Sequence, residues 1–293
     1  MVPSSKMGQI IIGMREAFAR GDNMMSWHRS TTQSAENDPV ATLIAYDLQS
    51  GSYVKNAIDN PEANRRWCQQ LSSIFRPLVN DGDTILEVGV GEATTLSGVM
   101  NELSVSHVKC LGFDLSWSRI MVGQNWASRQ GVAADLFVAD LFRIPLADDT
   151  VDVVYTSHSL EPNGGMEKEA IKELMRVARR AVVLVEPMYE FASSDAQERI
   201  LYHGYVRNLK PTAVELGARV LRHEPLEYSA NPLNPSGVLV LDISVEKPRP
   251  AIMWSCPMTQ CPMTRMDDVF VAEQVGIRIQ SSDQFRCSGA NTR

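Results

Sequence analysis

The chain has 293 residues and a formal net charge of -7; 44% of its residues are hydrophobic and 22% are charged. This length and composition provide a sizeable hydrophobic core and exclude wholesale disorder. Nucleic-acid binding needs clustered Lys and Arg that release counterions, so 28 basic residues against 35 acidic ones argue against a nucleic-acid partner.

The chain also shows no pattern for a membrane or for export. No apolar run approaches the roughly 20 residues that span a bilayer. The run Ile10-Ile11-Ile12 is followed at once by charged residues, with no small-residue cleavage site, which disfavours a signal peptide. Five scattered cysteines are odd in number and do not suggest a disulfide framework. We therefore expect a cytoplasmic protein without a membrane partner, and a homodimer stays open.

The first 79 residues predict helices. Apolar residues recur on one face between residues 9 and 20. Residues 38–50 and 61–79 predict two more helices, and the second begins with Pro61, a residue favoured at the first helical position. Residues 1–79 therefore read as an N-terminal helical extension that acts as a lid.

From residue 80 onward, short apolar strands alternate with amphipathic helices. The first five strands are predicted at residues 84–88, 108–113, 135–139, 151–156 and 181–185. Continuous apolar strands that alternate with helices indicate βαβ units and a parallel sheet buried on both faces. With later strands at 219–223 and 238–245, the fold class is α/β: a Rossmann-like, seven-stranded, mostly parallel sheet flanked by helices.

The pattern divides the rest of the chain into two parts. The main domain covers residues 80–247, with an insertion at 187–213 that is predicted to be helical over 190–210 and to contact the substrate. Residues 246–250 read as a linker. Residues 248–293 form a small C-terminal segment with little periodicity.

Polar or glycine residues end the predicted strands. In an open parallel sheet, ligands bind beyond the carboxyl ends of the strands. The residues found there are Gly89-Val90-Gly91, Asp114, Asp140, Ser157-His158 and Glu186. The sequence therefore predicts one ligand site that is built from several strand ends.

The glycine turn and the two aspartates indicate a nucleoside. Gly89 and Gly91 let the backbone approach a ligand closely. A dinucleotide-binding loop would have a third glycine where this chain has Thr94, so the turn suits a nucleoside without a pyrophosphate better than NAD or FAD. Asp114 can accept hydrogen bonds from ribose hydroxyls, and Asp140 can accept from the exocyclic amine of adenine.

Three stretches carry a family resemblance. They are Ile85-Leu86-Glu87-Val88-Gly89-Val90-Gly91, Gly112-Phe113-Asp114-Leu115-Ser116, and Ala139-Asp140-Leu141 with the residues from Ile144 to Val154. In this order they resemble the motifs of class I S-adenosylmethionine-dependent methyltransferases of the type 11 branch. Upstream, residues 46–53 are similar to a segment of a bacterial subgroup, and residues 157–165 are similar to its fourth motif.

The resemblance implies S-adenosyl-L-methionine as cofactor and assigns residues to it. Glu87, Gly89 and Gly91 would surround the methionine part, and Asp114 with Leu115 would hold the ribose. Asp140 and Leu141 would frame adenine. Ser157 and His158 would face the sulfonium and the acceptor, and Tyr53 would close over the cofactor. The cofactor-binding set is thus Tyr53, Glu87, Gly89, Gly91, Asp114, Leu115, Asp140, Leu141 and Ser157.

The same resemblance implies methyl transfer to a small-molecule substrate. A hydroxyl or amine acceptor must lose a proton, so His158 is the first candidate for a general base and Glu161 the second, with a purely structural His158 as the alternative. Aromatic residues in the insertion suit a sugar or a natural-product-like acceptor. A non-catalytic binding protein, a cyclase-type member of the fold and a nicotinamide oxidoreductase are the competing functions.

The C-terminal segment has a resemblance of its own. Trp254-Ser255-Cys256-Pro257 and residues 275–279 are similar to a small zinc-ribbon-like module. Zinc in a structural site takes four ligands. Only Cys256, Cys261 and Cys287 are present here, so the sequence predicts no metal.

Overall fold

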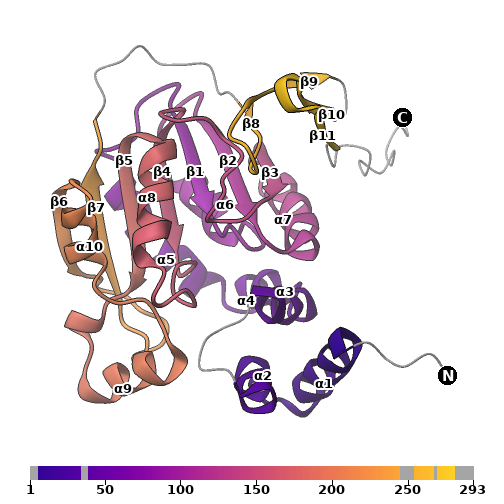
Figure 1. Cartoon of the computed structure of the whole chain (residues 1–293). Helices are drawn as coiled ribbons and strands as arrows, with labels where there is room; N and C mark the ends of the chain where they lie inside the picture. The colour runs from indigo at the N-terminus through magenta and orange to yellow at the C-terminus, as the bar shows by residue number, and fades with distance from the viewer. Residues whose placement is uncertain (1–5, 34–38, 245–253, 267–268, 281–293) are drawn as a thin grey trace, which may run out of the picture.

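The computed structural model (Figure 1) describes residues 6–33, 39–244, 254–266 and 269–280. In this part of the chain, five helices precede the sheet: α1 (Lys6–Arg20), α2 (Met24–Thr32), α3 (Pro39–Leu48), α4 (Ser52–Asp59) and α5 (Pro61–Phe75). The three helices expected from the sequence correspond to α1, α3 and α5. The sequence missed α2 and α4 because nine and eight residues are too few to show a clear helical period.

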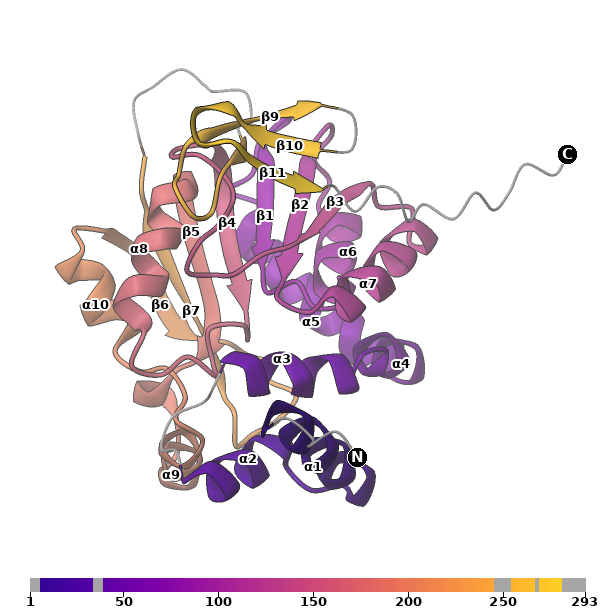
Figure 2. The same ribbon diagram turned by 45° about the vertical axis from the view of Figure 1, so that its right-hand side comes forward.

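The central sheet has seven strands in the order β3-β2-β1-β4-β5-β7-β6. They are β1 (Thr84–Val88), β2 (Lys109–Asp114), β3 (Ala134–Val138), β4 (Val151–Ser157), β5 (Ala178–Pro187), β6 (Arg219–Pro225) and β7 (Ser236–Asp242). The first five strands pair in parallel, whereas β7 runs antiparallel to β5 and β6. The predicted Rossmann-like, mostly parallel sheet is confirmed (Figure 2).

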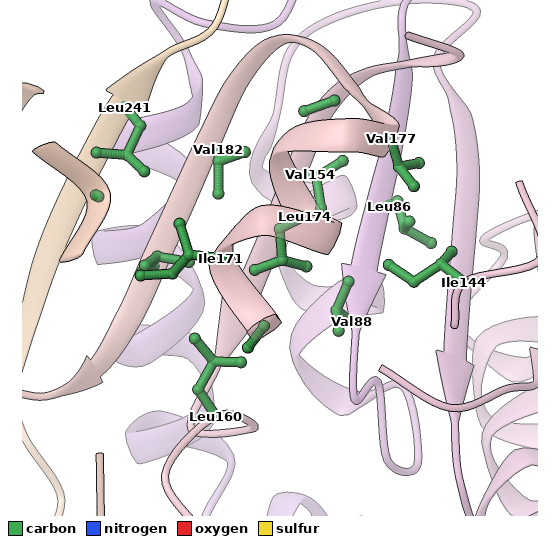
Figure 3. Packing of buried hydrophobic residues seen from close by; sticks show 14 of the residues in the cluster. Leu86, Val88, Ile144, Val154, Leu160, Ile171, Leu174, Val177, Val182 and Leu241 are labelled. Atoms are coloured by element: carbon green, nitrogen blue, oxygen red, sulfur yellow. The ribbon is translucent and has the colours of Figure 1, made fainter. Parts of the chain in front are cut away.

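Helices bury both faces of this sheet. The helices α5, α6 (Thr94–Glu102) and α7 (Trp117–Arg129) pack on one face, and α8 (Glu167–Val177) and α10 (Leu209–Glu215) pack on the other. Successive side chains of a strand point to opposite faces. In β1, Ile85 therefore joins the first core, while Leu86 and Val88 join the second, beside α8 (Figure 3).

The insertion differs from its prediction. Instead of one helix over residues 190–210, it contains a 3-10 turn (Tyr189–Phe191) and α9 (Ser194–His203), and α10 begins at Leu209. Gly204 ends α9 in the left-handed conformation with a φ of 65°. Glycine adopts this conformation without a Cβ penalty and commonly follows the end of a helix.

Residues 254–280 contain a small four-stranded sheet that the weak periodicity did not predict. Its strands are β8 (Trp254–Ser255), β9 (Pro262–Met266), β10 (Val269–Ala272) and β11 (Ile277–Gln280), in the order β11-β10-β9-β8. Cys256 is buried in its core. The predicted linker 246–250 and Cys287 lie outside the described residues.

Trp254 attaches this small sheet to the main domain. Its ring lies edge-on to Phe137 of β3, with 5.1 Å between ring centroids, and 4.9 Å from the ring of Phe270. The neighbouring Ser255 N–H donates to the carbonyl of Pro145 at 3.1 Å.

None of the described helices is long and apolar enough to cross a membrane.

We expect Trp254→Ala to lower the free energy of unfolding by about 2 kcal/mol. Truncating a half-buried Trp costs less stability than truncating a fully buried one. Urea denaturation followed by circular dichroism measures the change. Met258→Ala, in the turn between β8 and β9 and 63% exposed, is the control. Equal unfolding midpoints for the two variants would contradict the attachment.

Candidate active site

The strand ends open into one cavity of about 930 Å³. This is near the upper end of the volumes found for ligand pockets, which leaves room for two small molecules side by side. Of the residues that the sequence assigns to the site, the following line it: Tyr53, Gly89, Asp114, Leu115, Asp140, Leu141, Ser157 and His158. Glu87, Gly91 and Glu161 do not belong to the lining.

The turn after β1 requires its glycine. Gly89 has a φ of +68°, and a Cβ at this position would lie 2.3 Å from the Cβ of Ser159. The Ser159 hydroxyl, in turn, donates to the carbonyl of Val88 at 2.6 Å. The missing side chain therefore lets the loop after β4 pack directly on the turn after β1.

Asp114 ties the ends of β1 and β2 together. Its Oδ2 accepts from the Gly91 N–H at 3.0 Å, and its Oδ1 accepts from the Ser116 N–H at 2.8 Å. Burial raises the pKa of Asp114 above its ordinary value, although the N–H donors and the nearby Arg119 oppose the rise. Each carboxylate oxygen keeps acceptor capacity for a ligand hydroxyl, because it has accepted one donor only.

Glu87 lies on the opposite face of β1 from Leu86 and Val88, toward α6. It is only 2% exposed, and its Oε2 accepts from the Tyr155 hydroxyl at 2.7 Å. Burial raises the pKa of Glu87 to about 8. The alternation of side chains along β1 thus points this carboxyl into the core behind the turn, and its predicted contact with a ligand stays a prediction.

Asp140 lies at the other end of the cavity, just beyond β3. Its Oδ1 accepts from the Phe142 N–H at 2.9 Å, which fixes the turn that carries Leu141. The residue is exposed, unlike Asp114. The two carboxylates line one cavity, as the sequence predicts from their positions at the ends of adjacent strands.

His158 and Glu161 form a hydrogen-bonded pair. His158 Nδ1 lies 2.9 Å from Glu161 Oε2, and His158 Nε2 lies 2.7 Å from the hydroxyl of Ser236. Burial lowers the pKa of His158, but the hydrogen bond and charge of Glu161, together with Glu186, outweigh it, so the pKa lies above its ordinary 6.5. His158 also has a φ of 56°, in the left-handed region that few non-glycine residues adopt.

A buried carboxylate holds this loop in place. Glu186, at the end of β5, is fully buried, and it accepts the N–H groups of Ser159, Leu160 and Glu161 at 3.0–3.1 Å. Burial raises the pKa of Glu186 to about 7. Three backbone donors on one carboxylate fix the loop, and with it the direction in which His158 points.

The N-terminal helices close one side of the cavity through contacts that the sequence analysis missed. The guanidinium of Arg119 lies over the rings of both Tyr46 and Tyr53, at 4.7 and 4.4 Å from their centroids. The fully buried Glu92 accepts the N–H groups of Gly51 and Val54 at 2.8 and 2.7 Å. These contacts join the helices α3 and α4 to the turn after β1 and to α7. That the helices act as a lid stays a prediction.

The surroundings of His158 contain further residues that no local motif marks. Trp67 from α5 stands edge-on to the imidazole of His158, with 5.7 Å between centroids. Asn234 Nδ2 donates to Glu161 Oε2 at 3.1 Å, and its Oδ1 accepts from Arg199 at 3.1 Å. Asn234 lies more than 70 residues from Glu161 in the sequence, so only the fold brings them together.

The described residues offer no metal centre. Within residues 6–33, 39–244, 254–266 and 269–280, no group of three or more His, Cys, Asp or Glu side chains is placed to hold an ion.

The raised pKa of Glu87 makes a prediction about stability. Between pH 4.5 and about 8, the unfolded chain has released this proton while the folded chain retains it. The unfolded state then binds fewer protons, so this group lowers the free energy of unfolding as the pH rises. We expect Glu87→Gln to gain stability relative to the wild type on going from pH 5 to pH 8, by roughly a few kcal/mol.

Urea denaturation at the two pH values measures this difference. Glu62→Gln is the matched control because Glu62 is exposed and forms an ion pair with Arg65 on the surface of α5. A difference between the wild type and Glu87→Gln that is the same at both pH values would contradict the prediction.

Comparisons with known proteins agree with this architecture. Residues 85–181 match a family model described as a methyltransferase domain. No curated protein matches the chain. A chain in the complex between the Haloferax volcanii Trm112 methyltransferase activator and a protein described as a methyltransferase is similar, with 15% identity and a TM-score of 0.51 over 66% of this chain and 96% of that one.

The crystal structure of the cyclase SpnF is similar as well. It has 15% identity and a TM-score of 0.50, and the match covers 60% of this chain and 81% of SpnF. At such identities, the two structures show that the fold is shared.

Proposed function

We propose that this chain, whose residues 85–181 match a methyltransferase-domain model, is a class I S-adenosylmethionine-dependent methyltransferase. In this proposal it transfers a methyl group from the cofactor to a hydroxyl or amine of a small molecule. The observation that carries the proposal is the single cavity that Gly89, Asp114 and Asp140 share with His158. In this cavity the residues that we propose to bind a nucleoside lie together with a titratable group.

The residues of the cavity fit the cofactor. Asp114 retains acceptor capacity on both carboxylate oxygens for the two ribose hydroxyls. Asp140 offers an acceptor for the amine of adenine, and Leu141 offers an apolar wall beside it. The turn at Gly89 and the start of α6 at Thr94 supply room and N–H groups for the methionine part.

Bound S-adenosylmethionine supplies an electrophilic methyl group on a sulfonium. The protein has to align an acceptor with that methyl group, exclude water and take the acceptor's proton. Tyr53 and Ser157 line the cofactor side of the cavity, whereas Trp67, Tyr205 and Tyr228 line the remainder. The aromatic surfaces and polar tips of these three residues support a cyclic acceptor such as a sugar or a natural product.

His158 is the proposed proton acceptor. Its hydrogen bond to Glu161 stabilises the imidazolium that forms when the proton is taken up, which is the usual role of a carboxylate beside a catalytic histidine. Glu161 itself stays ionised: burial raises its pKa, but His158 and Asn234 outweigh this, and the pKa lies below its ordinary value.

The proposal is tested by binding and by transfer. Isothermal titration calorimetry with S-adenosylmethionine and S-adenosylhomocysteine, with NADH for comparison, establishes which nucleoside binds. Radiolabelled S-adenosylmethionine incubated with sugars, phenols and amines then shows whether a methyl group is transferred. Binding of NADH alone would favour an oxidoreductase, and cofactor binding without transfer to any extract fraction would favour a non-catalytic protein.

We expect Asp114→Asn to weaken cofactor binding by roughly ten- to a hundredfold, because charge-assisted hydrogen bonds to the ribose are worth about 1.5–3 kcal/mol. Calorimetry measures the change, and a thermal melt of the free protein checks that the variant folds. Asp135→Asn on the exposed surface of β3 is the control. A dissociation constant within twofold of the wild type would remove Asp114 from the site.

The His158–Glu161 pair predicts a specific pH profile. Only neutral His158 accepts a proton, so kcat should rise as the pH increases through the pKa of His158, above 6.5. Glu161→Gln removes the charge that raises this pKa, while Glu186 and Arg199 remain, so the rising limb should move to lower pH. His158→Ala should lower kcat by about a hundredfold or more with little change in cofactor affinity.

Initial rates measured between pH 5 and pH 9 test both statements. A rising limb that stays in place in Glu161→Gln would show that another group controls it.

A further inference from the structure

Both ring nitrogens of His158 are already occupied. Nδ1 is 2.9 Å from Glu161 Oε2, and Nε2 is 2.7 Å from the hydroxyl of Ser236. A small molecule in the cavity therefore cannot reach a nitrogen of His158 without displacing one of these partners. The group that faces an acceptor is one step further from the imidazole.

Ser236 is held rigidly in this position. It is the first residue of β7, where it pairs with Pro187 of β5, and its N–H donates to the Ser229 hydroxyl at 2.8 Å. The residue is 2% exposed, yet it lines the cavity. A buried hydroxyl that borders a ligand cavity and bonds to a histidine has the arrangement of an activated hydroxyl.

The directions of the hydrogen bonds follow from Glu161. An ionised carboxylate only accepts hydrogen bonds, so Nδ1 of neutral His158 carries the proton and donates it to Glu161. Nε2 is then the acceptor, and the Ser236 hydroxyl must donate to it. This leaves the lone pairs of Ser236 Oγ available to a donor in the cavity.

We propose that Ser236 receives the acceptor's proton and relays it to His158. As the acceptor oxygen or nitrogen takes the methyl group, its proton moves to Ser236 Oγ, and the hydroxyl proton of Ser236 moves to His158 Nε2. The carbon–sulfur bond breaks and leaves neutral S-adenosylhomocysteine. The positive charge of the sulfonium ends on the imidazolium beside Glu161, so atoms and charge balance.

This inference rests on the proposed function and narrows its substrate class. The relay serves an acceptor that donates an O–H or N–H to Ser236. Examples are an alcohol, or a phenol or amide that binds in its neutral, protonated form. It contributes nothing to an acceptor that has no proton to lose. Glu161 and Arg199 act as positioning residues: Glu161 bonds to His158 and Arg199 bonds to Asn234, and neither lines the cavity. Asn234 bonds to Glu161 and also lines the cavity.

The test compares Ser236→Ala with Ser236→Thr, which keeps the hydroxyl, and with Ser73→Ala, an exposed serine on α5 far along the chain from the relay. In the full-length protein without ligands, ¹⁵N NMR of labelled histidine reports the protonation and hydrogen bonding of each ring nitrogen; His158→Ala assigns the signals. We expect Ser236→Ala to shift the Nε2 resonance of His158, and the other two variants to leave it close to the wild-type position.

Turnover is measured with labelled S-adenosylmethionine and a panel of sugars, phenols and amines. Ser236→Ala should lower kcat by about a hundredfold, and Ser236→Thr should stay within about tenfold of the wild type. Residues that act as a unit are not additive, so Ser236→Ala combined with His158→Ala should be no slower than the slower single variant. The cofactor affinity of Ser236→Ala, Ser236→Thr and the double variant, measured by calorimetry, should stay within about twofold of the wild type.

The outcomes separate the relay from the proposed function. Loss of turnover in His158→Ala with wild-type turnover in Ser236→Ala would overturn the relay and leave the methyltransferase intact. Fully additive losses would do the same. A wild type that does not bind S-adenosylmethionine would overturn the proposed function. If no member of the panel is methylated, an unchanged Nε2 resonance in Ser236→Ala overturns the relay by itself.

Discussion

Parallel pairing of the first five strands is the constraint on which the site depends. Strands that run in the same direction end at the same edge, and β1 lies between β2 and β4, where the order of strands reverses. This placement brings Gly89, Asp114 and Ser157 to one cavity, although up to 68 residues separate them in the chain. The helices on both faces, packed through Leu86 and Ile85, keep this edge from shifting.

Buried carboxylates fix the loops at that edge of the sheet. Glu186 holds the N–H groups of residues 159–161, Glu92 holds those at the start of α4, and Asp114 holds those of Gly91 and Ser116. A buried charge is costly unless donors surround it. Each of these groups has two or more donors from the backbone. The same donors that compensate the carboxylate also order the loop, so site geometry and electrostatics share one cause.

The sequence predicted the parts of the fold and site that depend on local pattern. Apolar strands followed by Asp114 or Asp140 predicted the sheet and its ligand edge, because strand direction alone places their ends. It did not predict the break at Gly204, where a left-handed residue ends α9, or the small sheet around Cys256. It also missed Ser236 and Asn234, because they reach His158 through the antiparallel β7, and no motif near His158 encodes that pairing.

The two halves of the cavity are therefore built in different ways. The cofactor side is made by consecutive βα turns, so its residues follow one another in chain order and their spacing is fixed by strand and helix lengths. The part around His158, where we propose that the acceptor binds, is assembled from α5, the loop after β4, the insertion and the start of β7, which contribute Trp67, His158, Tyr205 and Ser236. Loops and insertions can change length without moving the sheet. The part of the cavity around His158 can therefore change while parallel pairing keeps Asp114 and Gly89 in place.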